Sequence, residues 1–177
     1  MEQTRQNVSP MSNEGRKAYV IEQPTQALSG LLTNKPLSDI SISELCDTAG
    51  VGRTSFYRNF ENKEDIVRSH IKELFGTMIK ENPDKEGQPL SSALKILFTH
   101  FETHREFYAL LNKRGLIYLL KDVIIGIFGP KPEHGMFEAY TKAYVAYSLY
   151  GWIEVWFQRG MRESAEELAG LFQGAGL

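Results

Sequence analysis

The sequence predicts an all-α protein, and three observations support this fold class. Along the 177-residue chain, apolar residues recur three and four positions apart, as they do on one face of an α-helix. Serine followed three residues later by glutamate, at Ser41 and at Ser164, is typical of a helix start. No stretch of useful length alternates polar and apolar residues as a β-strand does. We therefore expect helices joined by loops, without a sheet.

The first helix is expected over residues 16–33, where leucines gather on one face. Pro24 lies inside this range, removes a backbone donor and disfavours helical geometry at the preceding residue. The helix is therefore expected either to kink or to begin afresh near Pro24. Residues 1–14 are polar and lack the apolar core of a secretory signal, so they predict a flexible arm.

A short helix, a tight turn and a second short helix are expected over residues 41–60. Ser41 and Glu44 can satisfy each other's free backbone N–H groups where the first of these helices begins. Gly50 ends it, because a left-handed backbone is readily adopted only by glycine, and Val51 supplies an apolar plug under the corner. The second helix is expected to begin near residue 52 or 53 and to run to residue 60.

The second of these helices predicts a DNA-binding surface. Phe56 and Phe60 point inward, whereas the other face carries cations, hydroxyls, an amide and a tyrosine, with no acidic residue between Gly52 and Phe60. Such groups hold phosphates and contact base edges in the major groove. A helix-turn-helix inserts its second helix there, with the N-terminal residues nearest the bases. Arg53 and Thr54 are therefore the expected base-contacting residues.

Residues 49–66, AGVGRTSFYRNFENKEDI, resemble the DNA-binding signature of the TetR/AcrR family of bacterial transcriptional regulators. The resemblance lies in the glycine-valine turn, the aromatic pair, the phenylalanine that ends the second helix and the lysine that opens the next one. Gly52 and Asn59 depart from the serine and histidine common in that family. The resemblance implies a ligand-responsive regulator that binds a palindromic double-stranded DNA operator as a homodimer, and we expect a repressor.

The resemblance also implies roles for single residues of this domain, which is expected to span residues 15–61. Tyr57, Asn59 and Lys63 would hold phosphates, and Ser55 would approach the bases beside Arg53 and Thr54. The full set of expected DNA-binding residues is Ser43, Arg53, Thr54, Ser55, Tyr57, Arg58, Asn59 and Lys63.

Residues 62–177 predict a helical body for effector binding and dimerisation. A helix over residues 136–159 carries aromatic side chains on more than one face, so more than one neighbour must cover it. The other expected elements are a helix capped by Asn62 and ending near residue 80, a loop over 81–89, two or three helices over 90–128 broken near 112–115, a loop over 129–135, and a last helix opened by Ser164 and Glu167.

Aromatic residues at helical spacing are mostly ordinary core, but members of the family that this chain resembles hold a small-molecule effector in this part of the chain. The expected effector-binding residues are Phe101, Tyr108, Tyr118, Tyr140 and Tyr144. The expected dimer interface comprises Trp152, Trp156, Leu168, Leu171 and Phe172, from the last two helices.

Other signals for chemistry are few. His100 and His104 are spaced to share a metal, but no third ligand is evident nearby, and we expect two exposed histidines and no metal or other cofactor. The single cysteine, Cys46, suits a cytoplasmic protein and is expected to be a small buried side chain. The most apolar window, residues 143–153, is too short to span a bilayer.

The net charge of -2 gives no general sign of nucleic-acid binding, and residues 1–72 hold as many acidic as basic side chains. DNA binding would therefore use a small surface, with two copies adding their contacts. Three alternatives stay open: an activator or a regulator controlled by a protein partner, a helical adaptor that no longer binds DNA, and a metalloenzyme built on the two histidines. No nucleophile and base at a known spacing favours an enzyme.

Overall fold

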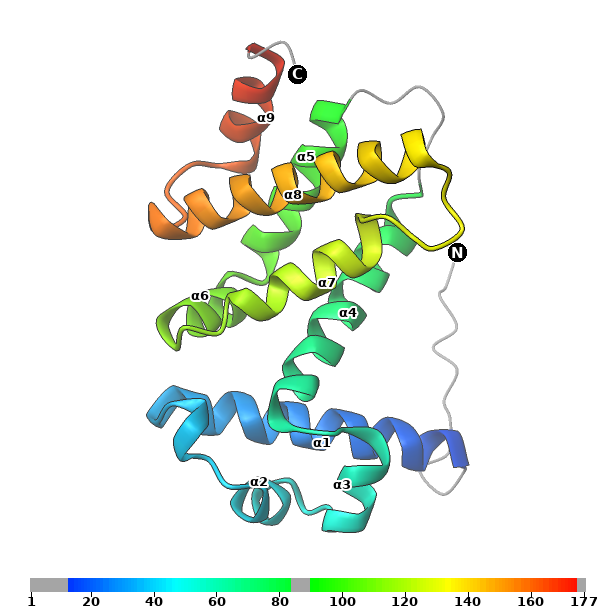
Figure 1. Ribbon diagram of the computed structural model, residues 1–177. Coiled ribbons are helices and arrows are strands. Elements are labelled where there is room, and N and C mark those ends of the chain that lie inside the picture. Colours follow the sequence, from blue (N-terminus) through cyan, green and yellow to red (C-terminus); the bar gives the residue numbers. More distant parts are fainter. Residues whose placement is uncertain (1–12, 84–89, 175–177) are drawn as a thin grey trace, which may run out of the picture. The chain divides into compact units, whose positions relative to one another are not determined.

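The computed structural model describes residues 13–83 and 90–174, and within them the chain is helical without a β-strand (Figure 1). The chain divides into two compact units, Met1–Ser69 and His70–Leu177. This division falls inside helix α4 (Lys63–Glu81), beyond the boundary expected at residue 61. The expected arm lies outside the described residues except for Asn13 and Glu14, which belong to helix α1 (Asn13–Asn34).

Helix α1 runs through Pro24 without a break, so the alternative of a fresh start near this residue is wrong. Pro24 cannot donate a backbone hydrogen bond, but its ring is buried, and this apolar burial offsets part of the cost. The neighbouring Thr25 hydroxyl donates to the Ile21 carbonyl at 3.0 Å, one turn earlier. The helix then ends at Asn34, as the proline at residue 36 predicts.

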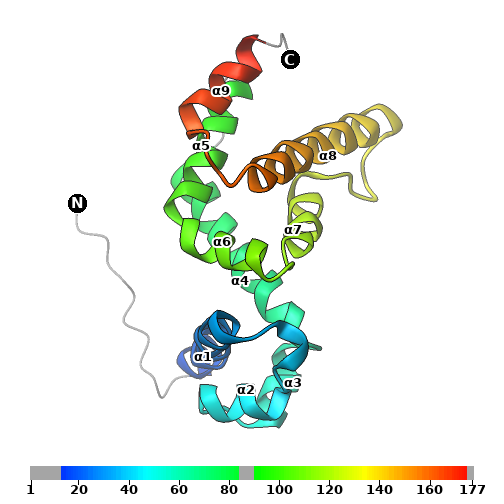
Figure 2. The same ribbon diagram turned by 90° about the vertical axis from the view of Figure 1, so that its left-hand side faces the viewer.

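In the first unit, α1 lies across α2 (Ile42–Ala49) and α3 (Arg53–Asn59), and these two also contact each other (Figure 2). A single turn of 3-10 helix, η1 (Leu37–Asp39), connects α1 to α2 and was not predicted. The buried apolar core of this unit includes Leu28, Leu32, Leu37, Ile40, Leu45, Phe56, Phe60, Ile66 and Val67.

The turn between α2 and α3 follows the prediction. Gly50 has φ 64°, in the left-handed region, and the Val51 N–H donates to the Cys46 carbonyl at 3.0 Å. This bond closes the end of α2, while the Val51 side chain is buried beneath the corner. The glycine conformation and the buried valine therefore both fix the corner between α2 and α3.

The start of α2 differs from the prediction in one respect. Ser41 Oγ accepts a hydrogen bond from the Glu44 N–H at 3.1 Å, as expected. The Glu44 carboxylate does not return to Ser41; it pairs with the Lys35 ammonium, with both oxygens 2.7 Å from Nζ. The Glu44 carboxylate therefore forms a partly exposed ion pair with a lysine outside the helix, instead of accepting a hydrogen bond from the Ser41 N–H. By contrast, Ser164 and Glu167 form both expected bonds.

The second unit contains the rest of α4 and five further helices: α5 (Leu90–Thr103), α6 (Arg105–Lys113), α7 (Tyr118–Phe128), α8 (Met136–Gln158) and α9 (Ala165–Gly174). Helix α9 packs along α5, and α8 packs along α7 (Figure 1). The expected break near residues 112–115 separates α6 from α7. A second break at His104, between α5 and α6, gives three helices over residues 90–128, within the two or three expected, but its position was not predicted.

Aromatic rings fill the core of the second unit. Trp156 lies edge-on to Phe98, with 5.4 Å between ring centroids, and Tyr108 lies edge-on to Phe101 at 4.7 Å. Both pairs are buried, so these four aromatic residues serve the unit's own packing. The expected loop over residues 81–89 lies mainly outside the described part of the chain. Within the described part, no helix combines the length and the apolar character needed to cross a membrane.

Candidate nucleic-acid interface

The outer face of α3 is the candidate interface. Arg53, Thr54, Tyr57 and Arg58 are exposed, and the inward-facing Phe56 is fully buried between them. Tyr57 exposes 58% of its surface, and its ring rests edge-on against Phe56 with 5.3 Å between centroids. The tyrosine is therefore an oriented surface residue with a free polar tip, and the helix presents two cations beside it.

Helices α2 and α3 bring two of the predicted residues together. The Arg53 guanidinium donates a hydrogen bond to Ser43 Oγ, with 2.5 Å between Nη2 and oxygen. Arg53 is the first residue of α3 and is exposed, whereas Ser43 is half-buried in the first turn of α2. The hydroxyl of one helix thus orients the cation of the next.

Two other predicted residues use their polar groups within the protein. Asn59 Nδ2 donates to the Ser55 carbonyl at 2.8 Å, one turn back along α3. The Lys63 ammonium lies 2.6 Å from both the Leu37 and the Ile40 carbonyl oxygens. Of the three residues that the family resemblance assigns to phosphates, only Tyr57 extends freely from the surface.

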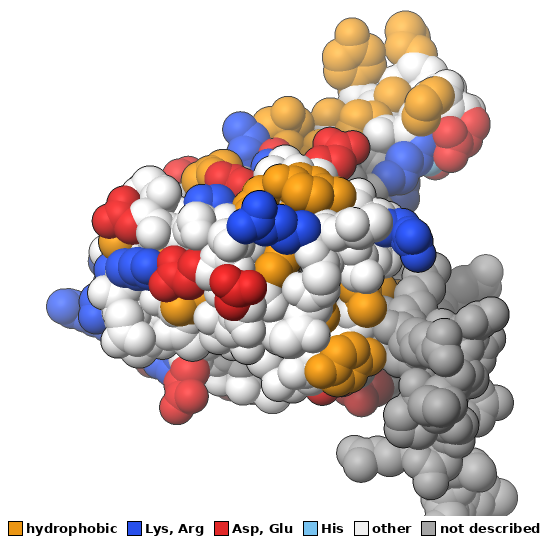
Figure 3. Space-filling view, turned by 90° about the horizontal axis from the view of Figure 1, so that it is seen from below, with side chains coloured by type: hydrophobic (Ala, Val, Ile, Leu, Met, Phe, Trp, Pro, Cys, Tyr) orange, Lys and Arg blue, Asp and Glu red, His pale blue; other side chains and the backbone are white. Residues whose placement is uncertain are grey.

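The charge around this face is mixed. Seen from the side of α2 and α3, blue basic and red acidic side chains lie interspersed among orange hydrophobic side chains and white atoms, and they do not form one continuous basic area (Figure 3). The cations of α3, Arg53 and Arg58, are consequently a local feature of a nearly neutral unit. Such a surface favours contacts that are few and well oriented over a general attraction to phosphate.

Cys46 lies beneath this face and is buried, as predicted. Burial raises the pKa of its thiol, while the nearby Arg53 guanidinium acts in the opposite direction. The net effect keeps the thiol protonated at neutral pH. Cys46 is therefore a packing residue of α2 rather than a reactive thiolate.

The structure separates the five expected effector-binding residues. Phe101 and Tyr108 are fully buried in the aromatic core, whereas Tyr140 and Tyr144 on α8 expose 76% and 65% of their surfaces. Tyr118, at the start of α7, is about half exposed. These five side chains cannot line one enclosed cavity within a single chain, because only two of them lie in its interior.

The expected dimer residues are also divided. Trp156, Leu168 and Phe172 are mostly buried within their own chain, and Trp152 is half-buried; Trp152, Trp156 and Leu168 also line an apolar groove between α8 and α9. Leu171 is exposed. The exposed apolar surface belongs largely to α8, the helix that the sequence predicts must be covered by more than one neighbour, although the predicted interface did not include its exposed side chains: Met136, Phe137, Tyr140, Tyr144, Tyr147 and Val155.

His100 and His104 face a pocket of about 290 Å³ between α4 and α5. His100 is buried, which corrects the expectation of two exposed histidines, and its Nε2 lies 2.9 Å from the Tyr108 hydroxyl. Burial lowers the pKa of His100 to about 4, and the neighbouring His104 adds to this shift. Among the described residues, no group of three or more histidine, cysteine or acidic side chains is arranged to hold a metal.

A glycine turn between two short helices, with a cationic and polar outer face on the second, defines a helix-turn-helix DNA-binding protein. Residues 26–69 match the family described as "Bacterial regulatory proteins, tetR family". This match confirms the sequence-based resemblance to the TetR family over residues 26–69, the part of the first unit that holds the helix-turn-helix.

Two further similarities extend the comparison. The chain is 26% identical over 83 residues to the HTH-type dhaKLM operon transcriptional activator DhaS of Lactococcus lactis subsp. lactis (strain IL1403). This match covers 47% of the chain and 43% of DhaS, so it spans less than half of that relative's length. The crystal structure of Lin0861 from Listeria innocua shares the fold over 94% of each chain, with a TM-score of 0.71 and 14% identity.

Proposed function

We propose that the protein is a homodimeric repressor that binds a palindromic DNA operator and releases it in response to a small-molecule effector. The observation that carries this proposal is the outer face of α3, where Arg53, Thr54, Tyr57 and Arg58 are exposed on a helix that carries no acidic residue. Arg53 at the N-terminal end suits contact with a guanine edge, and Arg58 and Tyr57 suit contact with phosphates.

The need for two copies follows from the size of the DNA-binding face. Helix α3 has only seven residues, and a single helix of this length makes too few contacts for a specific operator. A two-fold dimer presents two such helices about 34 Å apart, one to each half-site of a palindrome. The mixed charge of the unit strengthens this argument, because general attraction to phosphate contributes little.

The exposed stripe on α8 supports the same conclusion. Met136, Tyr140, Tyr144 and Tyr147 follow one another at intervals of four, four and three residues, so they share one face of the helix, and each exposes more than half of its surface. A contiguous apolar stripe of this kind is unfavourable in water and typical of an interface. A second copy placing its own α8 against this one would bury both stripes by the same contacts.

For the effector, the pocket between α4 and α5 is the best-supported location. The residues that line it include His100, His104, Thr99 and Asn82. The Tyr108 hydroxyl is hydrogen-bonded to His100. Neutral imidazoles and hydroxyls suit a small polar molecule. Such a molecule would act only if it bound more tightly to a form of the dimer whose α3 helices no longer fit the operator.

A second candidate is an activator, which the similarity to the activator DhaS favours. An activator could use the same DNA-binding face and the same dimer, so the two candidates differ only in the effect of DNA binding on transcription. A helical adaptor that no longer binds DNA is a further outcome that the experiment distinguishes, and control by a protein partner in place of a small molecule is an alternative that it leaves open. Either form of DNA binding requires the compartment that holds DNA, which in bacteria is the cytoplasm.

Selection of bound duplexes from a random pool, followed by titration of the selected duplex at several salt concentrations, tests the proposal. We expect a palindrome bound by two protomers, with affinity falling as salt rises. Transcription from a template carrying this palindrome then separates repression from activation. Weak binding without sequence preference would contradict the proposal and direct attention to the adaptor hypothesis.

A further inference from the structure

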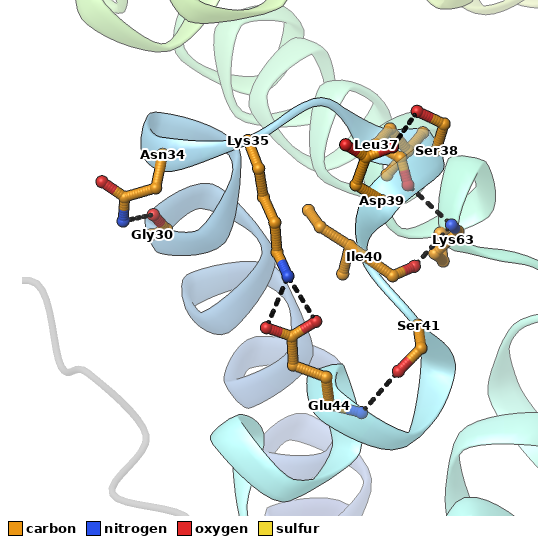
Figure 4. Close-up of polar contacts among 10 residues, drawn as sticks. All are labelled: Gly30, Asn34, Lys35, Leu37, Ser38, Asp39, Ile40, Ser41, Glu44 and Lys63. Carbon is orange, nitrogen blue, oxygen red and sulfur yellow. Dashed lines mark hydrogen bonds and ion pairs between the residues drawn. The ribbon is translucent and has the colours of Figure 1, made fainter.

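The first residue of α4 reaches back to the segment that precedes α2. Lys63 Nζ donates hydrogen bonds to the backbone carbonyls of Leu37 and Ile40, at 2.6 Å each (Figure 4). Leu37 opens η1, and Ile40 closes it and directly precedes Ser41, the N-cap of α2. A single ammonium thus links the start of α4 to the connection between α1 and α2, which lies 23 and 26 residues earlier in the sequence.

The two carbonyls belong to buried residues. Leu37 exposes 6% of its surface and Ile40 none, and the Leu37 carbonyl also accepts the Ile40 N–H at 3.2 Å within η1. A 3-10 turn leaves carbonyls without helical partners at its end, and an unpaired buried carbonyl is unfavourable. Hydrogen bonds from a charged donor are stronger than those between neutral groups. Lys63 therefore stabilises the conformation of this connection.

The position of this connection determines where the DNA-binding residues lie. Ser41, whose hydroxyl accepts the Glu44 N–H, follows Ile40 and starts α2. Ser43, in the first turn of α2, orients Arg53, and the corner at Gly50, closed by the Val51 N–H bond to the Cys46 carbonyl, joins α2 to α3. Displacement of the Ile40 carbonyl would consequently displace the base-contacting end of α3.

We propose that Lys63 is a positioning residue of the DNA-binding unit, which acts through the Leu37 and Ile40 carbonyls and not by binding a phosphate. This inference rests on the proposed DNA-binding function and deepens it. It also differs from the role that the family resemblance assigns to Lys63. An ammonium has three N–H donors, and two of them already point into the protein on a half-buried side chain.

The salt dependence of DNA binding separates the two roles. Lys63→Met keeps the length of the side chain but removes the donors. Under the positioning role, affinity for the selected operator falls about tenfold or more, while the slope of log K against log salt stays that of the wild type. Arg58→Met, which removes an exposed cation from α3, is the matched control and should reduce the slope by about 0.9 for each phosphate that the variant no longer neutralises.

Hydrogen exchange supplies a second readout that needs no DNA. The Ile40 N–H donates to the carbonyl that Lys63 holds, so Lys63→Met should accelerate its exchange. Lys35→Met removes a cation and the Glu44 ion pair from the same unit but leaves both carbonyl bonds, and Ile40 should keep its protection. If the wild type bound no DNA, the proposed function would fail, and the exchange result would still report on the bonds that Lys63 makes.

The wild-type protein offers a readout even if Lys63→Met does not fold. The ammonium protons of Lys63 should exchange with water more slowly, by NMR, than those of the exposed Lys80 at the far end of α4. Equal exchange at the two lysines would overturn the inference. The inference would also be overturned if Lys63→Met reduced the slope of log K against log salt by about one for each protomer. This holds whatever the rate of hydrogen exchange at Ile40.

Discussion

The guanidinium of Arg53 on α3 donates a hydrogen bond to the hydroxyl oxygen of Ser43 on α2, at 2.5 Å. The cation that lies nearest the expected position of the bases is therefore oriented before any DNA is present. Arginine has five N–H donors, so it can keep this bond and still offer two donors to a guanine edge. Preorganisation of this kind lowers the entropic cost of binding.

Arg53→Ala should relax base preference at one position of each half-site. A bidentate bond to a guanine contributes about 1–3 kcal/mol of discrimination, and this is the decrease expected at that base pair. Repeating the selection from random duplexes with the variant measures it. An unchanged base preference would show that Arg53 does not contact bases.

Ser43→Ala tests the orienting bond and leaves Arg53 in place. We expect the base preference to persist while affinity for the operator weakens by about 0.5–1.5 kcal/mol, the usual net contribution of one hydrogen bond. Binding titrations of the selected duplex and of its single-base variants give both quantities. An affinity equal to that of the wild type would mean that Ser43 has no role in orienting Arg53 for DNA.

Gly50→Ala should destabilise the first unit by about 1–2 kcal/mol, because an alanine disfavours the left-handed backbone at φ 64°. Steric overlap is not the cause, since an added Cβ would meet only the Tyr19 hydroxyl at 3.8 Å. Gly30→Ala is the matched control. Gly30 is exposed inside α1 with nothing within 4 Å of an added Cβ, so that change should stabilise by up to about 1 kcal/mol. Urea unfolding curves give the free energy of unfolding of both variants. If the two substitutions changed this free energy in the same direction, the result would contradict this account.

Acid should weaken the second unit through His100. Its pKa is lowered from 6.5 to about 4 by burial, so the unfolded chain binds a proton in a pH range where the folded chain does not. The free energy of unfolding therefore falls as the pH drops through 6.5 towards 4, by about 2 kcal/mol at pH 5 from this residue. His100→Gln keeps a donor for the Tyr108 oxygen and should flatten the pH dependence of unfolding. The same steepness in the variant and the wild type would refute the assignment.

Tyr140→Glu should weaken the dimer, because it places a charge in the middle of the exposed α8 stripe. Tyr118→Glu introduces the same charge at a tyrosine that is about half exposed on α7, outside the stripe, and should leave the dimer intact. Sedimentation over a range of concentrations measures the dissociation constant of each variant. If both variants associate as the wild type does, the α8 stripe is not the interface.

Local signals in the sequence predicted much of the fold and the position of the interface. The turn at Gly50, the cap at Asn62 and the box formed by Ser164 and Glu167 all appear as expected. Each depends on atoms a few residues apart, so a short pattern carries the information. The break at His104 had no such pattern, since neither proline nor glycine stands there.

The sequence by itself determined most of the helices, those helix ends that carry a glycine or a capping pair, the helix-turn-helix and the polar face of α3, because backbone hydrogen bonding and helical spacing act over a few residues. Only the tertiary structure decided which partners the long side chains choose. Lys63 holds carbonyls from 23 and 26 residues earlier, and Glu44 pairs with Lys35 instead of completing its own cap. It also decided which apolar residues remain exposed on α8. These outcomes depend on how distant segments pack, and the free energy of packing is not encoded in any one segment.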